Sequence, residues 1–107
     1  MQTSLSPDTK SRIESLLNSN KIVLFMKGDA SFPMCGFSAR AVAILRECQA
    51  EFKTVNVLDD EEIRQGIKEY GNWPTIPQLY VNKELVGGSD IMMEMFEAGE
   101  LQELIQK

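Results

Sequence analysis

The chain has 107 residues, of which 43% are hydrophobic and 25% charged, and its formal net charge is -5. This length and apolar content suit one compact domain whose core needs neither a metal nor a disulfide, and they leave no room for a second domain. The acidic balance argues against nucleic acid as a partner, because a phosphate-binding surface needs a dense basic patch. We therefore expect a single domain, residues 1–107, that binds no nucleic acid.

Neither export nor membrane insertion is indicated. Residues 1–20 are polar and charged, without the apolar core of a signal segment, and the longest apolar run, residues 22–26, is too short to span a bilayer. Two cysteines in such a chain indicate a reducing compartment, where thiols react or fill core space instead of cross-linking. We expect the cytoplasm, and a mature organellar form would have the same sequence features.

The N-terminal third predicts a helix, a strand and a loop. Ser-Pro-Asp at residues 6–8 supplies a capping side chain, a proline for the first helical position and an acid for the first turn. This helix should end near Asn18. Residues 21–27 contain the run Ile-Val-Leu-Phe-Met, whose length and β-branched content are typical of a buried strand, and residues 28–34 follow as a loop.

A second helix, a second strand and a third helix follow. From Gly36 onward, apolar side chains recur at the spacing of one buried helix face. They belong to Phe37, Ala41, Ile44, Leu45 and Cys48. Residues 51–57 alternate apolar and polar side chains, and a helical crossover would make this strand parallel to the first. Asp59 should begin the third helix in a capping-box-like pair with Glu62, and Gly71 should end it.

The segment after the third helix predicts a β-hairpin. Residues 73–77 contain two prolines and cannot be helical. Residues 78–81 and 84–86 then bracket Asn-Lys at residues 82–83 as a tight turn between two strands.

The chain should end in helix. Ser89 or Asp90 is expected to cap a helical region that extends to Gln106, with an interruption near Gly99. Its apolar side chains are interpreted as core and not as a partner groove: Ile91, Met92, Met95 and Phe96. The order of elements, αβαβαββα(α), implies an α/β fold with a mixed four-stranded sheet and helices on both faces.

Cys35 is the candidate reactive residue. It lies at the start of the second helix, where unpaired backbone N–H groups and the helix dipole stabilise an anion. Lys27, at the end of the first strand, would add positive charge, and both effects lower the pKa of a thiol. The alternative is an inert cysteine, but an inert thiol is more typical of an apolar face than of a loop beside Pro33.

Cys35 has no partner within the chain for a disulfide. Cys48 lies about 20 Å further along the same helix, whereas bridged Cα atoms lie within about 7 Å, and we interpret Cys48 as core. Ser38 occupies the place of the second cysteine of a dithiol motif. Disulfide exchange at Cys35 would therefore need an external thiol, and since the chain has no histidine, a metal site would need ligands from outside.

Three motifs give the chain a family resemblance. They are Cys-Gly-Phe-Ser at residues 35–38, Trp-Pro-Thr-Ile-Pro at 73–77 and Gly-Gly-Ser-Asp at 87–90. In order and position they resemble those of a monothiol glutaredoxin of the C-G-F-S class, and the resemblance extends from Lys21 to residues 99–101. It implies a thioredoxin-like fold, glutathione binding, and a [2Fe-2S] cluster that bridges two protomers.

The resemblance implies a function in iron–sulfur chemistry. Such a cluster is normally held by four thiolates, so two Cys35 sulfurs and two glutathione sulfurs would complete a homodimeric site. Exchangeable ligands suit a carrier that transfers clusters to acceptor proteins and takes part in iron homeostasis. One alternative is an oxidoreductase, weakly active as in C-G-F-S relatives, that reduces protein–glutathione mixed disulfides through Cys35 alone. Another is a regulatory heterodimer with a BolA-like protein.

The resemblance also implies cationic partners for the glycine-end carboxylate of glutathione. Lys27 and Arg64 match the family's positions for this contact, where a charge-assisted pair is expected. Lys68, one turn after Arg64, is a weaker candidate. Arg64 and Lys68 could equally form a solvated helix face.

A loop and a helix start would bind the rest of glutathione. Thr75, Ile76 and Pro77 match a loop in which Pro77 is cis and the Ile76 backbone pairs with the ligand as an added strand. Trp73, just before this loop, is either a packing residue or a partner contact.

At the helix start, Ser89 and Asp90 would receive the γ-glutamyl carboxylate and ammonium, and Gly88 would permit close approach. Each of these residues could instead have a simple turn or capping role. Many relatives have a second cysteine where this chain has Ser89, so a disulfide from Cys35 to that position is excluded here.

Overall fold

Four strands form one mixed sheet in the order β2-β1-β3-β4. The computed structural model describes residues 5–107. β1 pairs in parallel with β2 and antiparallel with β3, and β3 pairs antiparallel with β4. This sheet confirms the predicted topology, including the hairpin. The strands are β1 (Ile22–Met26), β2 (Lys53–Asn56), β3 (Gln78–Val81) and β4 (Glu84–Gly87).

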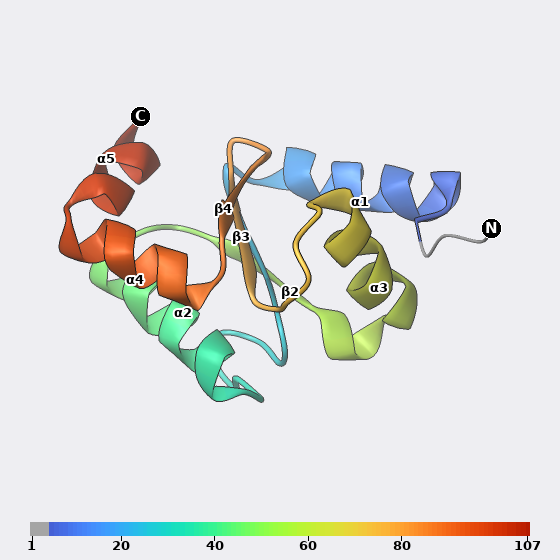
Figure 1. The fold of residues 1–107 in the computed structure, drawn as a ribbon, viewed down its shortest axis with the longest axis horizontal. Coiled ribbons are helices and arrows are strands. Elements are labelled where there is room, and N and C mark those ends of the chain that lie inside the picture. Colours follow the sequence, from blue (N-terminus) through green and yellow to red (C-terminus); the bar gives the residue numbers. More distant parts are fainter. Residues whose placement is uncertain (1–4) are drawn as a thin grey trace.

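Helices cover both faces of the sheet, as expected (Figure 1). One face carries α1 and α3, and the other carries α2 and α4, with α5 packed against α4. A single 3-10 turn, η1, joins β2 to α3. The bounds are α1 (Pro7–Ser19), α2 (Gly36–Glu47), η1 (Val57–Asp59), α3 (Glu61–Tyr70), α4 (Ser89–Glu97) and α5 (Glu100–Gln106). Among residues 5–107, no helix has the length and apolar character needed to cross a bilayer.

The central strand β1 is buried along its whole length. Alternate side chains of a strand point to opposite faces, so Leu24 and Met26 pack with α2 and α4, whereas Val23 and Phe25 pack with α1 and α3. Two buried faces require the unbroken apolar run that the sequence shows. Lys27 follows the last residue of β1 and lies near the first turns of α2 and α4.

Helix α1 begins as predicted. The Ser6 hydroxyl accepts a hydrogen bond of 3.1 Å from the backbone N–H of Thr9, and Pro7 occupies the first helical position. The interruption at Gly99 is also confirmed, since this residue has a left-handed backbone (φ 77°) between α4 and α5.

Helix α3 begins one residue later than predicted. Asp60, and not Asp59, is the N-cap, and its carboxylate accepts a hydrogen bond of 3.2 Å from Ile63 N–H and pairs with Arg12 of α1. The Asn56 side chain accepts from Leu58 N–H at 3.0 Å and holds the chain in η1, which includes Asp59. The predicted pair of Asp59 with Glu62 was therefore wrong.

Helix α4 also differs at its start. Its N-cap is Gly88, which has no side chain to offer, while Ser89 and Asp90 already lie in the first turn. Because β4 runs through Gly87 directly into the helix, neither of the two predicted caps is outside it. Met92 is buried, and Met95 and Phe96 pack against the same core, in agreement with the core interpretation of these three residues, while Ile91 is half-buried.

One predicted core residue of α2 is exposed. Ala41, Ile44 and Leu45 are buried, and Cys48 packs at the edge of the same core. Phe37, however, is 57% exposed. It lies in the first turn of the helix, so the helical spacing predicted the wrong environment for this side chain.

The Asp60 cap should stabilise the fold in a pH-dependent way. We expect Asp60→Ala to lower the free energy of unfolding at neutral pH by about 1 kcal/mol. Partial burial raises the pKa of Asp60, but the Ile63 N–H group and the Arg12 guanidinium outweigh it and hold that pKa below its usual value. The stabilisation is then complete above the unfolded-state pKa and is lost as pH falls through the folded-state pKa.

The exposed Asp59 provides a matched control with the same change in charge. Urea unfolding of both variants across a range of pH should show a loss for Asp60→Ala that shrinks on acidification, and little change for Asp59→Ala. Equal losses in the two variants would contradict the capping role of Asp60.

Candidate functional site

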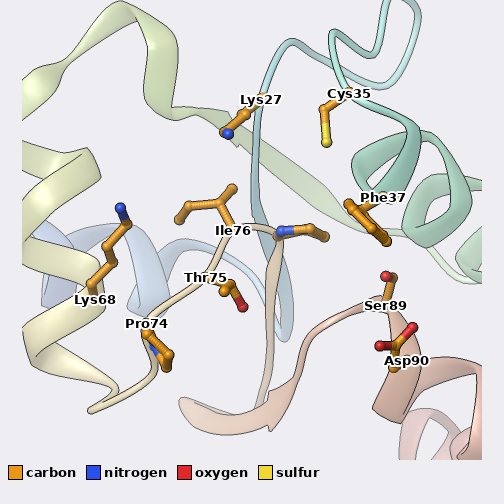
Figure 2. Close-up of a pocket in the computed structure, with 10 residues that line it drawn as sticks. Lys27, Cys35, Phe37, Lys68, Pro74, Thr75, Ile76, Ser89 and Asp90 are labelled. Carbon is orange, nitrogen blue, oxygen red and sulfur yellow. The ribbon is translucent and has the colours of Figure 1, made fainter.

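A cleft of about 410 Å³ lies where β1 ends, between the starts of α2 and α4 and the loop before β3 (Figure 2). Sites for small molecules commonly have volumes of roughly 300–1,000 Å³. Every predicted site residue lines this cleft except Arg64 and Gly88. The lining residues are Lys27, Cys35, Phe37, Lys68, Pro74, Thr75, Ile76, Pro77, Ser89 and Asp90.

The loop between β1 and α2 folds back so that Cys35 returns to the end of β1. Met34 N–H donates to the Lys27 carbonyl at 2.9 Å, and Gly28 N–H donates to the Asn56 side chain at 2.9 Å. Gly28 has a φ of 87°, and a Cβ there would lie 2.4 Å from the Phe32 carbonyl oxygen. Only glycine fits this turn, which brings the thiol beside Lys27.

Cys35 is the N-cap of α2, and its sulfur points into the cleft (Figure 2). The thiol forms no cap hydrogen bond, so the neighbouring N–H groups act on it as dipoles. Burial by itself raises the pKa of Cys35, but the N–H groups of Ser38 and Phe37, the Ser38 hydroxyl and the charge of Lys27 together bring it below the ordinary value. This confirms the thiolate stabilisation expected at the helix start.

Ser38 has a structural role that its sequence position did not reveal. It is fully buried, and its Oγ accepts a hydrogen bond of 3.1 Å from the backbone N–H of Lys27. The hydroxyl can still donate its own proton, and it acts on the Cys35 sulfur to lower the thiol pKa. Ser38 therefore links the end of β1, the first turn of α2 and the reactive atom.

The peptide bond between Ile76 and Pro77 is cis, as the resemblance implied. β3 begins at Gln78, so the backbone N–H and C=O of Ile76 lie beyond the hydrogen-bonded sheet. Gly88 lies behind this loop, where a Cβ would be 3.3 Å from the Pro77 carbonyl oxygen. Gly88 thus lets the start of α4 approach the loop closely.

The two candidates on α3 lie differently relative to the cleft. Lys68 lines the cleft together with Lys27. Arg64 does not line it, and its Nη1 lies 3.4 Å from the Glu61 carboxylate within the same helix. At the opposite wall Ser89 is buried, and the exposed Asp90 carboxylate lies 3.8 Å from the Arg40 guanidinium.

The described residues offer one reactive thiol, Cys35, as a metal ligand in the cleft. Within residues 5–107, no three histidine, cysteine or acidic side chains gather as metal ligands. Both cysteines are free. Burial, and then the charge of Glu47, raise the pKa of Cys48 above the ordinary value, whereas the pKa of Cys35 lies below it.

The fold and the thiol site have a known counterpart. The family model described as glutaredoxin matches residues 22–86. The chain belongs to the glutaredoxin family. It is a monothiol member, with Ser38 in place of a second cysteine, and its fold is the thioredoxin-like one of solved glutaredoxins.

Individual relatives agree with this assignment. The chain is 57% identical over 102 residues to the uncharacterized monothiol glutaredoxin ycf64-like of Synechocystis sp., covering 95% of each chain. It is 53% identical to monothiol glutaredoxin-S14, chloroplastic, of Arabidopsis thaliana, covering 98% of this chain and 61% of that one. Reduced poplar apo GrxS14 has a TM-score of 0.85 at 48% identity, with 97% of this chain and 95% of that chain covered.

We expect Ser38→Ala to raise the pKa of Cys35 and to slow its alkylation at neutral pH, because the hydroxyl no longer stabilises the thiolate. The rate of iodoacetamide modification, followed across pH by peptide mass spectrometry, measures the shift. Cys48 is an internal reference in the same molecule, and thermal unfolding verifies that the variant folds. A folded variant with an unchanged pH profile at Cys35 would show that the hydroxyl has no part in activating the thiol.

Proposed function

We propose that the protein binds glutathione in the cleft beside Cys35 and carries a [2Fe-2S] cluster as cargo between two copies of the chain. Its role would be cluster transfer to acceptor proteins and iron homeostasis. The observation that carries the proposal is a single activated thiol, opening into a cleft of tripeptide-compatible size, without a second thiol in reach. Thiolate is the ligand that iron–sulfur clusters use, so the donor fits this cargo.

The polarity of the cleft supports glutathione as its occupant. In Figure 2, Lys27 and Lys68 lie on one side of the loop that carries Thr75 and Ile76, and Ser89 lies on the other side. The Cys35 sulfur points toward the space between them. Glutathione has the matching order of groups, with a carboxylate at one end, a thiol near the middle, and a carboxylate and an ammonium at the other end.

Each end of the ligand then has proposed partners. Lys27 and Lys68 would pair with the glycine-end carboxylate, with Arg64, one turn before Lys68, as a secondary contact. The N–H groups at the start of α4 would receive the γ-glutamyl carboxylate, and Asp90 would accept from the ammonium. The complete proposed set is Cys35, Lys27, Arg64, Lys68, Thr75, Ile76, Pro77, Gly88, Ser89 and Asp90.

The partner in the proposed complex is a second copy of the chain. Three large apolar side chains near Cys35 are exposed: Phe32 at 71%, Met34 at 58% and Phe37 at 57%. An exposed apolar patch of this kind supports a protein contact around the thiol. A BolA-like protein is the alternative occupant of the same face. The proposed compartment is the cytoplasm, and relatives of the chain include proteins named chloroplastic and mitochondrial.

A second candidate function uses the same thiol. The Cys35 thiolate would attack the glutathione sulfur of a protein mixed disulfide, and the target cysteine would leave as a thiolate. A second glutathione would then attack the Cys35–glutathione disulfide, which releases glutathione disulfide and restores the Cys35 thiolate. The lowered pKa of Cys35 favours this chemistry. High turnover in a glutathione-coupled reductase assay would favour this function over cluster transfer.

Reconstitution tests the cluster proposal. Anaerobic incubation of the apoprotein with iron, sulfide and glutathione should give a visible chromophore and a shift from monomer to dimer on size exclusion. Both should disappear in Cys35→Ser and in wild type without glutathione, since half of the proposed ligands are then missing. Cys48→Ser is the matched control and should behave as wild type. A chromophore that survives in Cys35→Ser would overturn the proposal.

The two cations on α3 should contribute unequally to glutathione binding. We expect Lys68→Met to weaken the affinity about fivefold, equivalent to about 1 kcal/mol, because Lys68 lines the cleft. Arg64→Met removes the same charge from outside the cleft and should change the affinity less. An NMR titration of each variant with glutathione measures both effects. A larger loss for Arg64→Met would restore the ranking that the sequence suggested.

A further inference from the structure

Gln78 is a fully buried amide at the base of the ligand loop. Its Nε2 donates to the carbonyl of Trp73 at 2.9 Å and to the carbonyl of Thr75 at 3.2 Å, and its Oε1 accepts from the Tyr80 hydroxyl at 3.0 Å. Both amide protons and the oxygen are thus engaged. The reverse orientation of the amide would place its oxygen against two carbonyl oxygens, so this network has one arrangement.

The network is anchored on its inner side. Tyr80 is buried, and its ring contacts Phe25 edge-on at 5.6 Å and Tyr70 at 6.3 Å between ring centroids. Burial raises the pKa of the Tyr80 phenol well above its usual value, so the hydroxyl stays a donor. A Cβ at Gly71 would lie 2.3 Å from that hydroxyl and 3.1 Å from Gln78 Oε1, so the end of α3 closes over the pair.

The hydrogen bond to Thr75 determines where the next N–H group points. The carbonyl of Thr75 and the N–H of Ile76 belong to one peptide unit, which is planar. This unit is trans, because among the described residues the cis bond is the next one, between Ile76 and Pro77. In a trans peptide the C=O and N–H point in opposite directions. With its carbonyl held inward by Gln78, this unit directs the Ile76 N–H away from the core.

We propose that Gln78 is a positioning residue for ligand binding, which holds the Thr75 carbonyl so that the Ile76 N–H faces the cleft. This inference rests on the proposed function in so far as the ligand is glutathione. Gln78 does not line the cleft, and it acts only through the loop backbone. A second hydrogen bond from the same amide holds the Trp73 carbonyl and so fixes the start of the loop. The N–H of Trp73 in turn donates to the Lys68 carbonyl at 3.0 Å, which ties the loop to the end of α3.

The test separates loop positioning from general stability. Gln78→Leu removes all three hydrogen bonds of the amide, whereas Tyr80→Phe removes only the inner one and leaves both bonds to the loop. We expect Gln78→Leu to weaken glutathione binding about tenfold and to shift the Ile76 amide signal in the NMR spectrum of the free protein. Tyr80→Phe should lower the melting temperature yet keep the affinity within twofold and leave the Ile76 signal near its wild-type position.

The outcomes distinguish this inference from the proposed function. If wild type shows no glutathione binding, the proposed function fails, and the Ile76 signal of the free variants still decides whether Gln78 positions the loop. If wild type binds and folded Gln78→Leu binds equally well with an unmoved Ile76 signal, the inference is overturned. Gln78→Met, an unbranched side chain without the amide, must give the same loss and serves where the leucine variant does not fold.

Discussion

The hydrogen bond from the Lys27 N–H to the Ser38 hydroxyl joins the central strand to the first turn of α2, and the reactive centre depends on it. β1 is fixed by burial on both faces, so its end has a definite place in the fold. The loop that follows must then return the chain to that end, and the Ser38 side chain holds it there. The pKa of Cys35 is lowered as a result, because the N–H groups of Ser38 and Phe37, the Ser38 hydroxyl and the charge of Lys27 meet at this junction and outweigh the effect of burial.

Buried polar side chains concentrate around the cleft. In the described part of the chain they are Thr9, Ser38, Gln78 and Ser89, and all but Thr9 lie at or beneath the site. A buried polar group is unfavourable unless it is hydrogen-bonded. Ser38 and Gln78 meet this requirement by binding backbone groups of the segments that form the walls. Polar contacts below the site thus hold its walls, while the cleft itself stays open to a ligand.

The elements of the fold were predictable from the sequence because apolar periodicity records which faces are buried. The ends of the elements were less predictable. The Asn56 side chain binds the Leu58 N–H and holds Asp59 in the turn before α3, so the helix is capped by Asp60 and not by Asp59 as predicted. Phe37 has the helical spacing of a core residue but is exposed. Periodicity describes a helix face and does not say how far the neighbouring layer extends.

In the site, the residues that belong to a sequence motif were predictable. Cys35 and the loop of Ile76 and Pro77 lie where the motifs placed them, at one cleft. The roles of Ser38 and Gln78 were not accessible in this way, because each depends on a partner that only the folded chain brings near. Which of Arg64 and Lys68 lines the cleft depended likewise on how α3 is rotated against it.

Net charge limits how the proposed dimer is held together. Each chain has a formal charge of -5, so two copies repel one another at distances within the screening length, about 8 Å at physiological salt. Near Cys35 the exposed side chains include the apolar Phe32, Met34 and Phe37, and the cleft holds the cations Lys27 and Lys68 beside the carboxylate of Asp90. Three exposed side chains per copy form a contact well below the size of a stable interface. The shared ligands, and not the protein surfaces, would then hold the two copies together, and their departure would return the protein to monomers.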